Sequence, residues 1–181
     1  MQRETLGHTL PGNKGVVSIG VGCSVENNPL DYEKPVSDYW PQFGAQLKFD
    51  TTVAELVSHQ AGLYQFEPAI EPPDLYDWQA MTTRRASQKP AWDPGSAFGY
   101  HALTWGYLTG ELIRQITGKS AGETIREFLP EAQFFIGLSK KEQSRCADVI
   151  GPNHARVHLS PNAKTRTGKL TTNDPLLTPY K

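Results

Sequence analysis

Apolar residues recur at near-helical spacing in several segments of the chain, which predicts a mainly α-helical protein with little sheet. The clearest helix is predicted over residues 101–117, where leucines and isoleucines fall on one face and Gly118 follows as a C-terminal stop. An apolar run predicts a buried helix over residues 14–25. A three-residue spacing of apolar side chains predicts another helix over residues 74–88.

Shorter helices are predicted from three capping boxes, in which a Ser or Thr hydroxyl accepts a hydrogen bond from the amide three residues on and a Glu side chain reaches back. The pairs are Thr52 with Glu55, Ser120 with Glu123, and Ser139 with Glu142. They predict helices that end near residues 58–59, 129 and 146–147. An aromatic cluster indicates one further helical turn, formed by Val36, Tyr39, Trp40 and Phe43. The apolar run at 134–138 predicts a strand or an extended docking segment.

The 181 residues are enough for one domain with a sizeable core, and the pattern weakens towards both ends. Residues 1–13 lack periodicity and are predicted to be an irregular N-terminal segment. Residues 14–147 form the predicted domain. Residues 148–181 are rich in Thr, Pro and Asn, so we expect a loosely structured tail there.

The composition excludes several classes of function. The net charge is −1 with both signs mixed, so there is no basic surface for nucleic acid or an anionic membrane. No apolar run is long enough to span a bilayer or to act as a signal peptide, which favours a cytoplasmic protein. Two cysteines, Cys23 and Cys146, are more simply two reduced thiols than a bridge. We expect no cofactor and no metal site, because the five histidines show no ligand spacing on a predicted helix: His8, His59, His101, His154 and His158.

Three short motifs stand in order along the chain. They are Lys14-Gly15, the sequence Ser-His-Gln-Ala-Gly-Leu at 58–63, and Trp-Asp-Pro-Gly-Ser-Ala-Phe-Gly-Tyr at 92–100. The last motif places Tyr100 after a proline-glycine turn and before a long helix, where a phenol can move protons. In order and spacing the three resemble the serine β-lactamase and penicillin-binding-protein superfamily, and specifically its β-lactamase-related esterase branch. The resemblance extends over residues 14–138.

The resemblance implies an acyl-transfer site. In that superfamily a serine attacks an acyl carbonyl, a lysine three residues later helps to remove its proton, and a tyrosine completes the proton transfer. By resemblance, Lys14 is this lysine and Tyr100 is this tyrosine, and the substrate is a small-molecule ester or amide. The family fold combines an antiparallel sheet with helices, and we expect this chain to be a truncated member that holds mainly the helical portion.

Pro11 occupies the position of the nucleophile, three residues before Lys14. Proline has neither a hydroxyl nor an amide hydrogen, so it removes the nucleophile and one oxyanion donor together. No lysine in the chain has a serine three positions before it. The nearest match to the family's C-terminal Lys-Thr-Gly strand, at 164–168, lies in a polar stretch. We therefore expect an inactive member; the alternatives are an esterase that uses another nucleophile and a non-enzymatic interaction module.

Tyr100 is followed by His101 and Ala102, where many family members have an asparagine at the second position, and this difference resembles the esterase branch. The phenol could instead cap the next helix or pack against Trp92. Ser58 and His59 invite a catalytic interpretation, but adjacent residues on a short helix point in different directions, so a packing role is favoured.

The pair Arg84-Arg85 is most simply a solvated helix face. If the sheet is absent, apolar residues that normally pack on it should be exposed, and self-association becomes a further expectation. The residues expected to be exposed are Val16, Ile19, Leu108 or Ile113.

Overall fold

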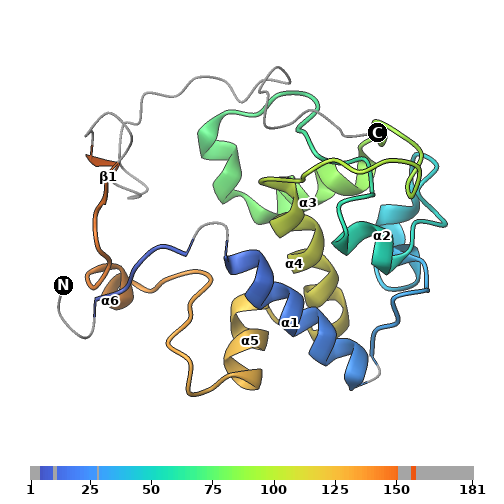
Figure 1. Ribbon diagram of the computed structural model, residues 1–181. Coiled ribbons are helices and arrows are strands. Elements are labelled where there is room, and N and C mark those ends of the chain that lie inside the picture. The colour runs from blue at the N-terminus through green and yellow to red at the C-terminus, as the bar shows by residue number, and fades with distance from the viewer. Residues whose placement is uncertain (1–4, 10–11, 28, 151–155, 158–181) are drawn as a thin grey trace.

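A computed structural model describes residues 5–9, 12–27, 29–150 and 156–157, and within these ranges the protein is mainly helical (Figure 1). The α-helices are α1 (Asn13–Glu26), α2 (Val53–Val57), α3 (Trp78–Ser87), α4 (Thr104–Thr117), α5 (Ala121–Phe128) and α6 (Lys140–Gln143). Three 3-10 helices, η1 (Val36–Asp38), η2 (Pro41–Gly44) and η3 (Pro72–Tyr76), lie between them. The strands β1 (Val149–Ile150) and β2 (Arg156–Val157) form one short antiparallel pair. The predicted mainly helical fold with little sheet is confirmed.

Helix α4 lies at the centre of the core and contacts α1, α2, α3 and α5 (Figure 1). Leu108, Leu112 and Ile113 on this helix are fully buried. The expectation that Leu108 and Ile113 would be exposed is therefore wrong, because the other helices, and not a sheet, cover them. Ile19 on α1 is 51% exposed, as expected, and Val16 is half-buried.

Gly20 lies where α1 approaches α5 closely. A Cβ added at Gly20 would already be 3.4 Å from Ile125 of α5. Val17 and Val21 of α1 are buried against the same core. This packing places the first turn of α1, which carries Lys14, beside the start of α4.

The helix boundaries follow the sequence signals closely. All three predicted capping boxes are present, at the starts of α2, α5 and α6. The helix predicted over 74–88 is shorter, because Asp77 breaks it: its side chain accepts a hydrogen bond from Ala80 N–H at 2.9 Å and caps α3. The helix predicted from residue 101 begins at Thr104, because His101 is held in a loop.

Two cations are buried at α3, Arg85 on the helix itself and Lys48 beside it. The Lys48 ammonium donates to the carbonyls of Ala45, Ala86 and Gln88 at 2.7–2.9 Å, two of which lie at the C-terminal end of the helix. Burial and the neighbouring Arg85 guanidinium lower the pKa of Lys48 to about 8.

The prediction of a solvated Arg84-Arg85 pair is wrong for Arg85, which is fully buried. Its guanidinium lies over the Phe66 ring at 4.7 Å and donates to Gln65 O at 2.6 Å. Its position on α3 points it into a second apolar cluster around Phe66, and the helical pattern of the sequence does not show this cluster.

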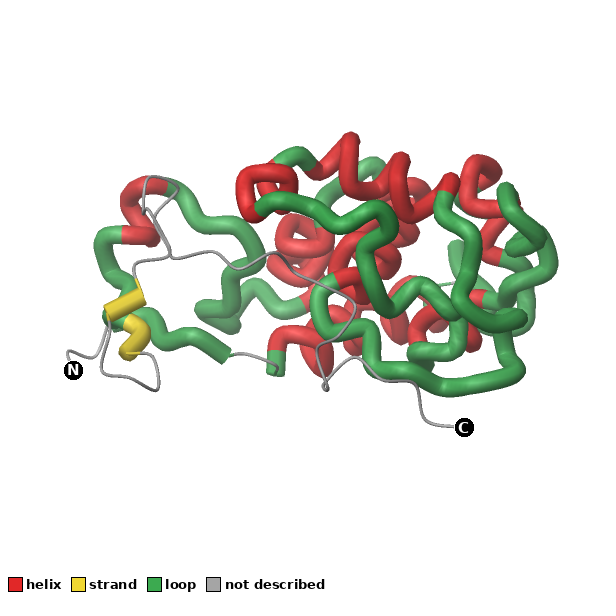
Figure 2. Tube along the Cα trace, turned by 90° about the horizontal axis from the view of Figure 1, so that it is seen from above, coloured by secondary structure: helices red, strands yellow, loops and turns green. Residues whose placement is uncertain are grey.

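The segments on either side of the helices pair with each other at one end of the molecule (Figure 2). Leu6 N–H donates to Arg145 O and Ala147 N–H donates to Leu6 O, each at 2.9 Å. Residues 134–138 form no strand and remain extended or turned. Cys23 and Cys146 are free thiols. Most of the predicted tail, 151–155 and 158–181, lies outside the described residues, and no described helix has the length and apolar character needed to cross a bilayer.

Candidate active site

Residues 91–101 lie before α4 and include Tyr100. A series of hydrogen bonds joins this segment to residues 59–63. Ala91 N–H donates to Gly62 O at 2.8 Å, and Gly95 N–H donates to Gln60 O at 3.2 Å. Gly99 N–H donates to the carbonyl of His59 at 3.2 Å. The motif Ser-His-Gln-Ala-Gly-Leu at 58–63 therefore acts as the support for the tyrosine loop, in agreement with the predicted packing role.

Two histidines tie the two segments together through their rings. His101 N–H donates to Nδ1 of His59 at 3.1 Å, and Leu63 N–H donates to Nε2 of His101 at 3.0 Å. A ring nitrogen that accepts carries no proton, so both imidazoles are neutral in this arrangement. Nδ1 of His101 then donates to Gly99 O at 2.5 Å.

The electrostatics agree with neutral rings. Burial lowers the pKa of His101 to about 4. Burial, and then the Lys14 ammonium, lower the pKa of His59 to about 4. His59 has φ +68°, a left-handed backbone that is uncommon outside glycine and that turns its carbonyl and its ring towards the tyrosine loop.

Lys14 lies directly against Tyr100. Its ammonium is 5.2 Å from the centroid of the Tyr100 ring and 6.0 Å from that of Trp105. It donates to the carbonyl of Ala102 at 2.8 Å. At the position where many family members have an asparagine side chain, the backbone oxygen of Ala102 holds the lysine.

Tyr100 neither caps α4 nor pairs with Trp92. The N-cap of α4 is Leu103, and the ring of Tyr100 lies 5.1 Å from that of His59. Trp92 instead covers Gly99, where an added Cβ would lie 2.5 Å from Cη2 of the indole. The close approach at Gly99 fixes the backbone immediately before Tyr100.

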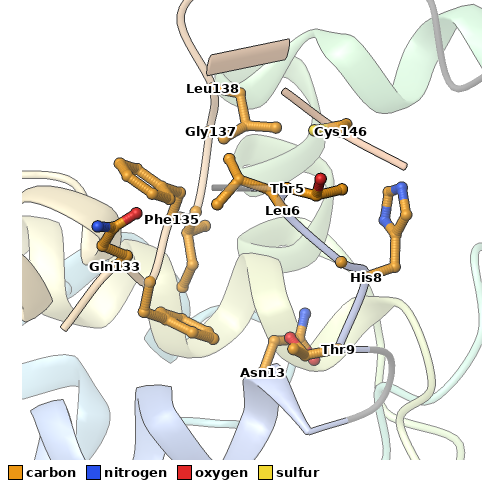
Figure 3. A pocket seen from close by; sticks show the side chains of 13 residues that line it. Thr5, Leu6, His8, Thr9, Asn13, Gln133, Phe135, Gly137, Leu138 and Cys146 are labelled. Carbon is orange, nitrogen blue, oxygen red and sulfur yellow. The ribbon is translucent and has the colours of Figure 1, made fainter. Parts of the chain in front are cut away.

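A cavity of about 520 Å³ runs from Lys14 along α4 between α1, α5 and residues 136–137. We call it the α1–α4 groove; its walls include Lys14, Val17, Trp78, Leu103, Trp105 and Gly106. A second cavity, about 680 Å³, lies between the N-terminal segment and residues 133–138 (Figure 3). Thr5, Leu6 and His8 face Gln133 and Phe135 across it, and neither Lys14 nor Tyr100 lines it.

The structure therefore brings the two predicted site residues, Lys14 and Tyr100, into contact. It adds His59, His101 and Trp105, which the sequence did not identify as part of the site. The adjacency of His101 to Tyr100 was a usable signal, whereas the approach of His59 depends on its left-handed backbone. Pro11, His154, His158 and the 164–168 match lie outside the described residues.

Comparison with known proteins identifies the class. The sequence matches the Beta-lactamase family over residues 13–174, and the chain belongs to that family. Its described helices match the helical portion of the fold, as the sequence predicted.

Individual relatives agree with this assignment. Esterase/beta-lactamase LipL of Mycobacterium tuberculosis is 39% identical over 144 residues, which cover 77% of this chain and 33% of LipL. A penicillin-binding protein homologue from Caulobacter crescentus superposes with a TM-score of 0.79 at 34% identity, covering 84% of this chain and 42% of that one. A family VIII carboxylesterase superposes with a TM-score of 0.71 at 39% identity, covering 75% and 38%. The chain thus spans about a third of the length of the curated relative.

Proposed function

We propose that this chain is a β-lactamase-related protein that retains the lysine–tyrosine pocket of its family but does not turn over esters or amides through an acyl-serine. The observation that carries the proposal is Pro11, three residues before Lys14, at the place of the nucleophile. In a hydrolase whose catalytic groups act as a unit, loss of the nucleophile costs roughly a million-fold in rate.

The contacts of Lys14 support this proposal. Its nitrogen donates to a backbone carbonyl and lies against aromatic rings, and neither of these contacts is with a serine hydroxyl from which the neutral amine could take a proton. Among the named relatives, one is an esterase/beta-lactamase and another a carboxylesterase, so the ligand class that fits an inherited pocket is a small ester, amide or related acyl compound.

A second candidate is an esterase that uses another nucleophile, favoured by the contact between Lys14 and Tyr100. The two candidates differ in whether a covalent adduct forms. Purified protein should be treated with a fluorophosphonate probe and assayed in parallel on 4-nitrophenyl butyrate and on a chromogenic β-lactam.

The proposal expects no labelled serine and hydrolysis at the chemical background. Tyr100→Phe should then be indistinguishable from the unmodified chain, as should Tyr76→Phe, which alters an exposed tyrosine that lines neither of the two cavities. Labelling that disappears in Tyr100→Phe and persists in Tyr76→Phe would establish the esterase instead.

A further inference from the structure

We propose that the α1–α4 groove binds a small amphipathic carboxylate, with its anionic group at Lys14 and its apolar body along α4. This inference rests on the proposed function, because a lysine that has no nucleophile to activate can serve as a charged binding group. The expected ligand resembles the acid product of ester cleavage and not the ester itself.

The size and walls of the groove fit such a molecule. Its volume of about 520 Å³ lies within the 300–1,000 Å³ typical of small-molecule sites. Trp78 and Trp105 provide aromatic walls, and Val17 and Leu103 provide aliphatic ones. Leu103 is partly exposed at 47%, so a bound apolar body would remove it from water.

The positive charge is concentrated at one end of the groove. An ammonium can donate three hydrogen bonds, and within the described part of the chain Lys14 donates one, to Ala102 O. It takes part in neither of the salt bridges found in the described ranges. A carboxylate is the group that would satisfy these donors best, because charge-assisted hydrogen bonds are the strongest that an ammonium makes.

The helix itself adds to this charge. Lys14 lies in the first turn of α1, which contains no acidic residue and has no side-chain cap at Gly12. The positive end of the α1 dipole and the ammonium therefore repel each other, and a bound anion would relieve both.

The opposite end of the groove is already neutralised. Arg114, which also lines it, forms two hydrogen bonds with the buried Glu111, at 2.9 and 2.7 Å. The groove-lining residues include no aspartate or glutamate. A monocarboxylate with an uncharged apolar body is thus favoured over a dicarboxylate or an amine.

The test uses 4-phenylbutyrate and its uncharged analogue 4-phenylbutanamide, titrated calorimetrically into the full chain at pH 7.5 and low salt. Quenching of tryptophan fluorescence provides a second readout, since two of the four tryptophans line the groove. The acid should bind with a Kd tighter than about 1 mM. The amide should bind about 10- to 100-fold more weakly, because it lacks the charge that pairs with Lys14.

Two variants separate the charge from the cavity. Lys14→Met removes the charge and leaves an unbranched apolar side chain in its place. It should weaken binding of the acid about 10- to 100-fold and leave binding of the amide unchanged. Gly106→Leu fills the groove at a position where an added Cβ has open space, and should abolish binding of both compounds. Gly15→Leu is the matched control: it also lies on a helix with open space around an added Cβ, but it does not line the groove, so binding should persist.

Equal affinity for acid and amide, binding that survives Gly106→Leu, or no binding to the unmodified chain would each overturn the inference. Sedimentation of all variants adds a further outcome. A dimer that Gly106→Leu disrupts and Gly15→Leu preserves would mean that a second copy occupies the groove. Ester hydrolysis is measured on the same samples. A rate above the chemical background would contradict the proposed function, whether or not the carboxylate binds.

Discussion

The backbone N–H of His101 donates to Nδ1 of His59 across 3.1 Å, and this bond joins the support segment 59–63 to the loop that presents Tyr100. Because His101 also accepts from Leu63 N–H, each ring uses an unprotonated nitrogen as an acceptor. Protonation of either ring would turn an acceptor into a donor that faces another donor. The placement of Tyr100 therefore depends on two neutral histidines.

Acid should destabilise the protein through this pair. Burial lowers the pKa of His101 to about 4, against about 6.5 for an unfolded histidine. Between these two pH values the unfolded chain binds more protons than the folded chain. The contribution of the neutral ring to the free energy of unfolding is therefore fully present above about pH 6.5 and is lost as the pH falls to about 4. For His101 it amounts to about 3 kcal/mol, and His59 changes in the same direction.

Urea unfolding at pH 7.0, 5.5 and 4.5 measures this loss. His101→Gln should be less stable than the unmodified chain at pH 7.0, but its free energy of unfolding should fall less steeply as the pH is lowered. His8→Gln, which alters an exposed histidine, should retain the full decline. Parallel curves for all three proteins would contradict a role for the buried ring.

Gly99→Ala should displace the tyrosine loop. The added methyl group would lie 2.5 Å from Cη2 of Trp92, whose indole is itself fixed by donation to Gln60 O at 3.1 Å. Overpacking of this kind costs about 1–3 kcal/mol, and near-ultraviolet circular dichroism should record the altered Trp92 environment. Gly15→Ala supplies the comparison: it has open space in a helix and should be neutral or stabilising by up to about 1 kcal/mol. Equal melting temperatures for the two variants would count against the steric account.

Lys48→Met should be among the more destabilising single changes, because it leaves the buried carbonyl oxygens of Ala86 and Gln88 without their side-chain donor. Buried unsatisfied groups cost about 1–3 kcal/mol each, so we expect a loss on the order of 3 kcal/mol after partial relaxation. Lys89→Met removes an exposed lysine just beyond the same helix and should change stability by no more than about 0.5 kcal/mol. Chemical denaturation of both variants at pH 7 makes the comparison, and similar midpoints would show that Lys48 is not structural.

Local signals in the sequence predicted the helices well. The capping boxes at Thr52, Ser120 and Ser139 mark helix starts because their hydrogen bonds join residues only three apart. Lys14 and Tyr100 were identified by resemblance, since their contact spans 86 positions that no local pattern relates.

The errors have a common physical origin in tertiary burial. Arg85 is buried because the carbonyl of Gln65 accepts its hydrogen bond and the Phe66 ring lies against its guanidinium, although charge alone predicts exposure. Leu108 is buried because four helices surround α4, which periodicity on one helix does not reveal. His59 joins the site through a left-handed backbone that its residue type does not require.

Restoring a hydroxyl at position 11 tests whether the pocket still functions. In the family, the lysine activates a serine one helical turn before it, and Lys14 remains beside Tyr100. Pro11→Ser should therefore gain fluorophosphonate labelling at position 11, at least about 10-fold above the unmodified chain. The gain should vanish when Lys14→Met is added, because the hydroxyl would again lack a base.

Pro11→Ala is the matched control, since it removes the same proline without supplying a nucleophile. Any backbone effect of losing the ring appears in both variants, so only the difference between them reports on the hydroxyl. Labelling of Pro11→Ser alone would mean that one residue separates this chain from covalent reaction with a fluorophosphonate. If both variants stay unlabelled while remaining folded, the contact between Lys14 and Tyr100 is not sufficient to activate a serine in this chain, and the pocket is a binding site only.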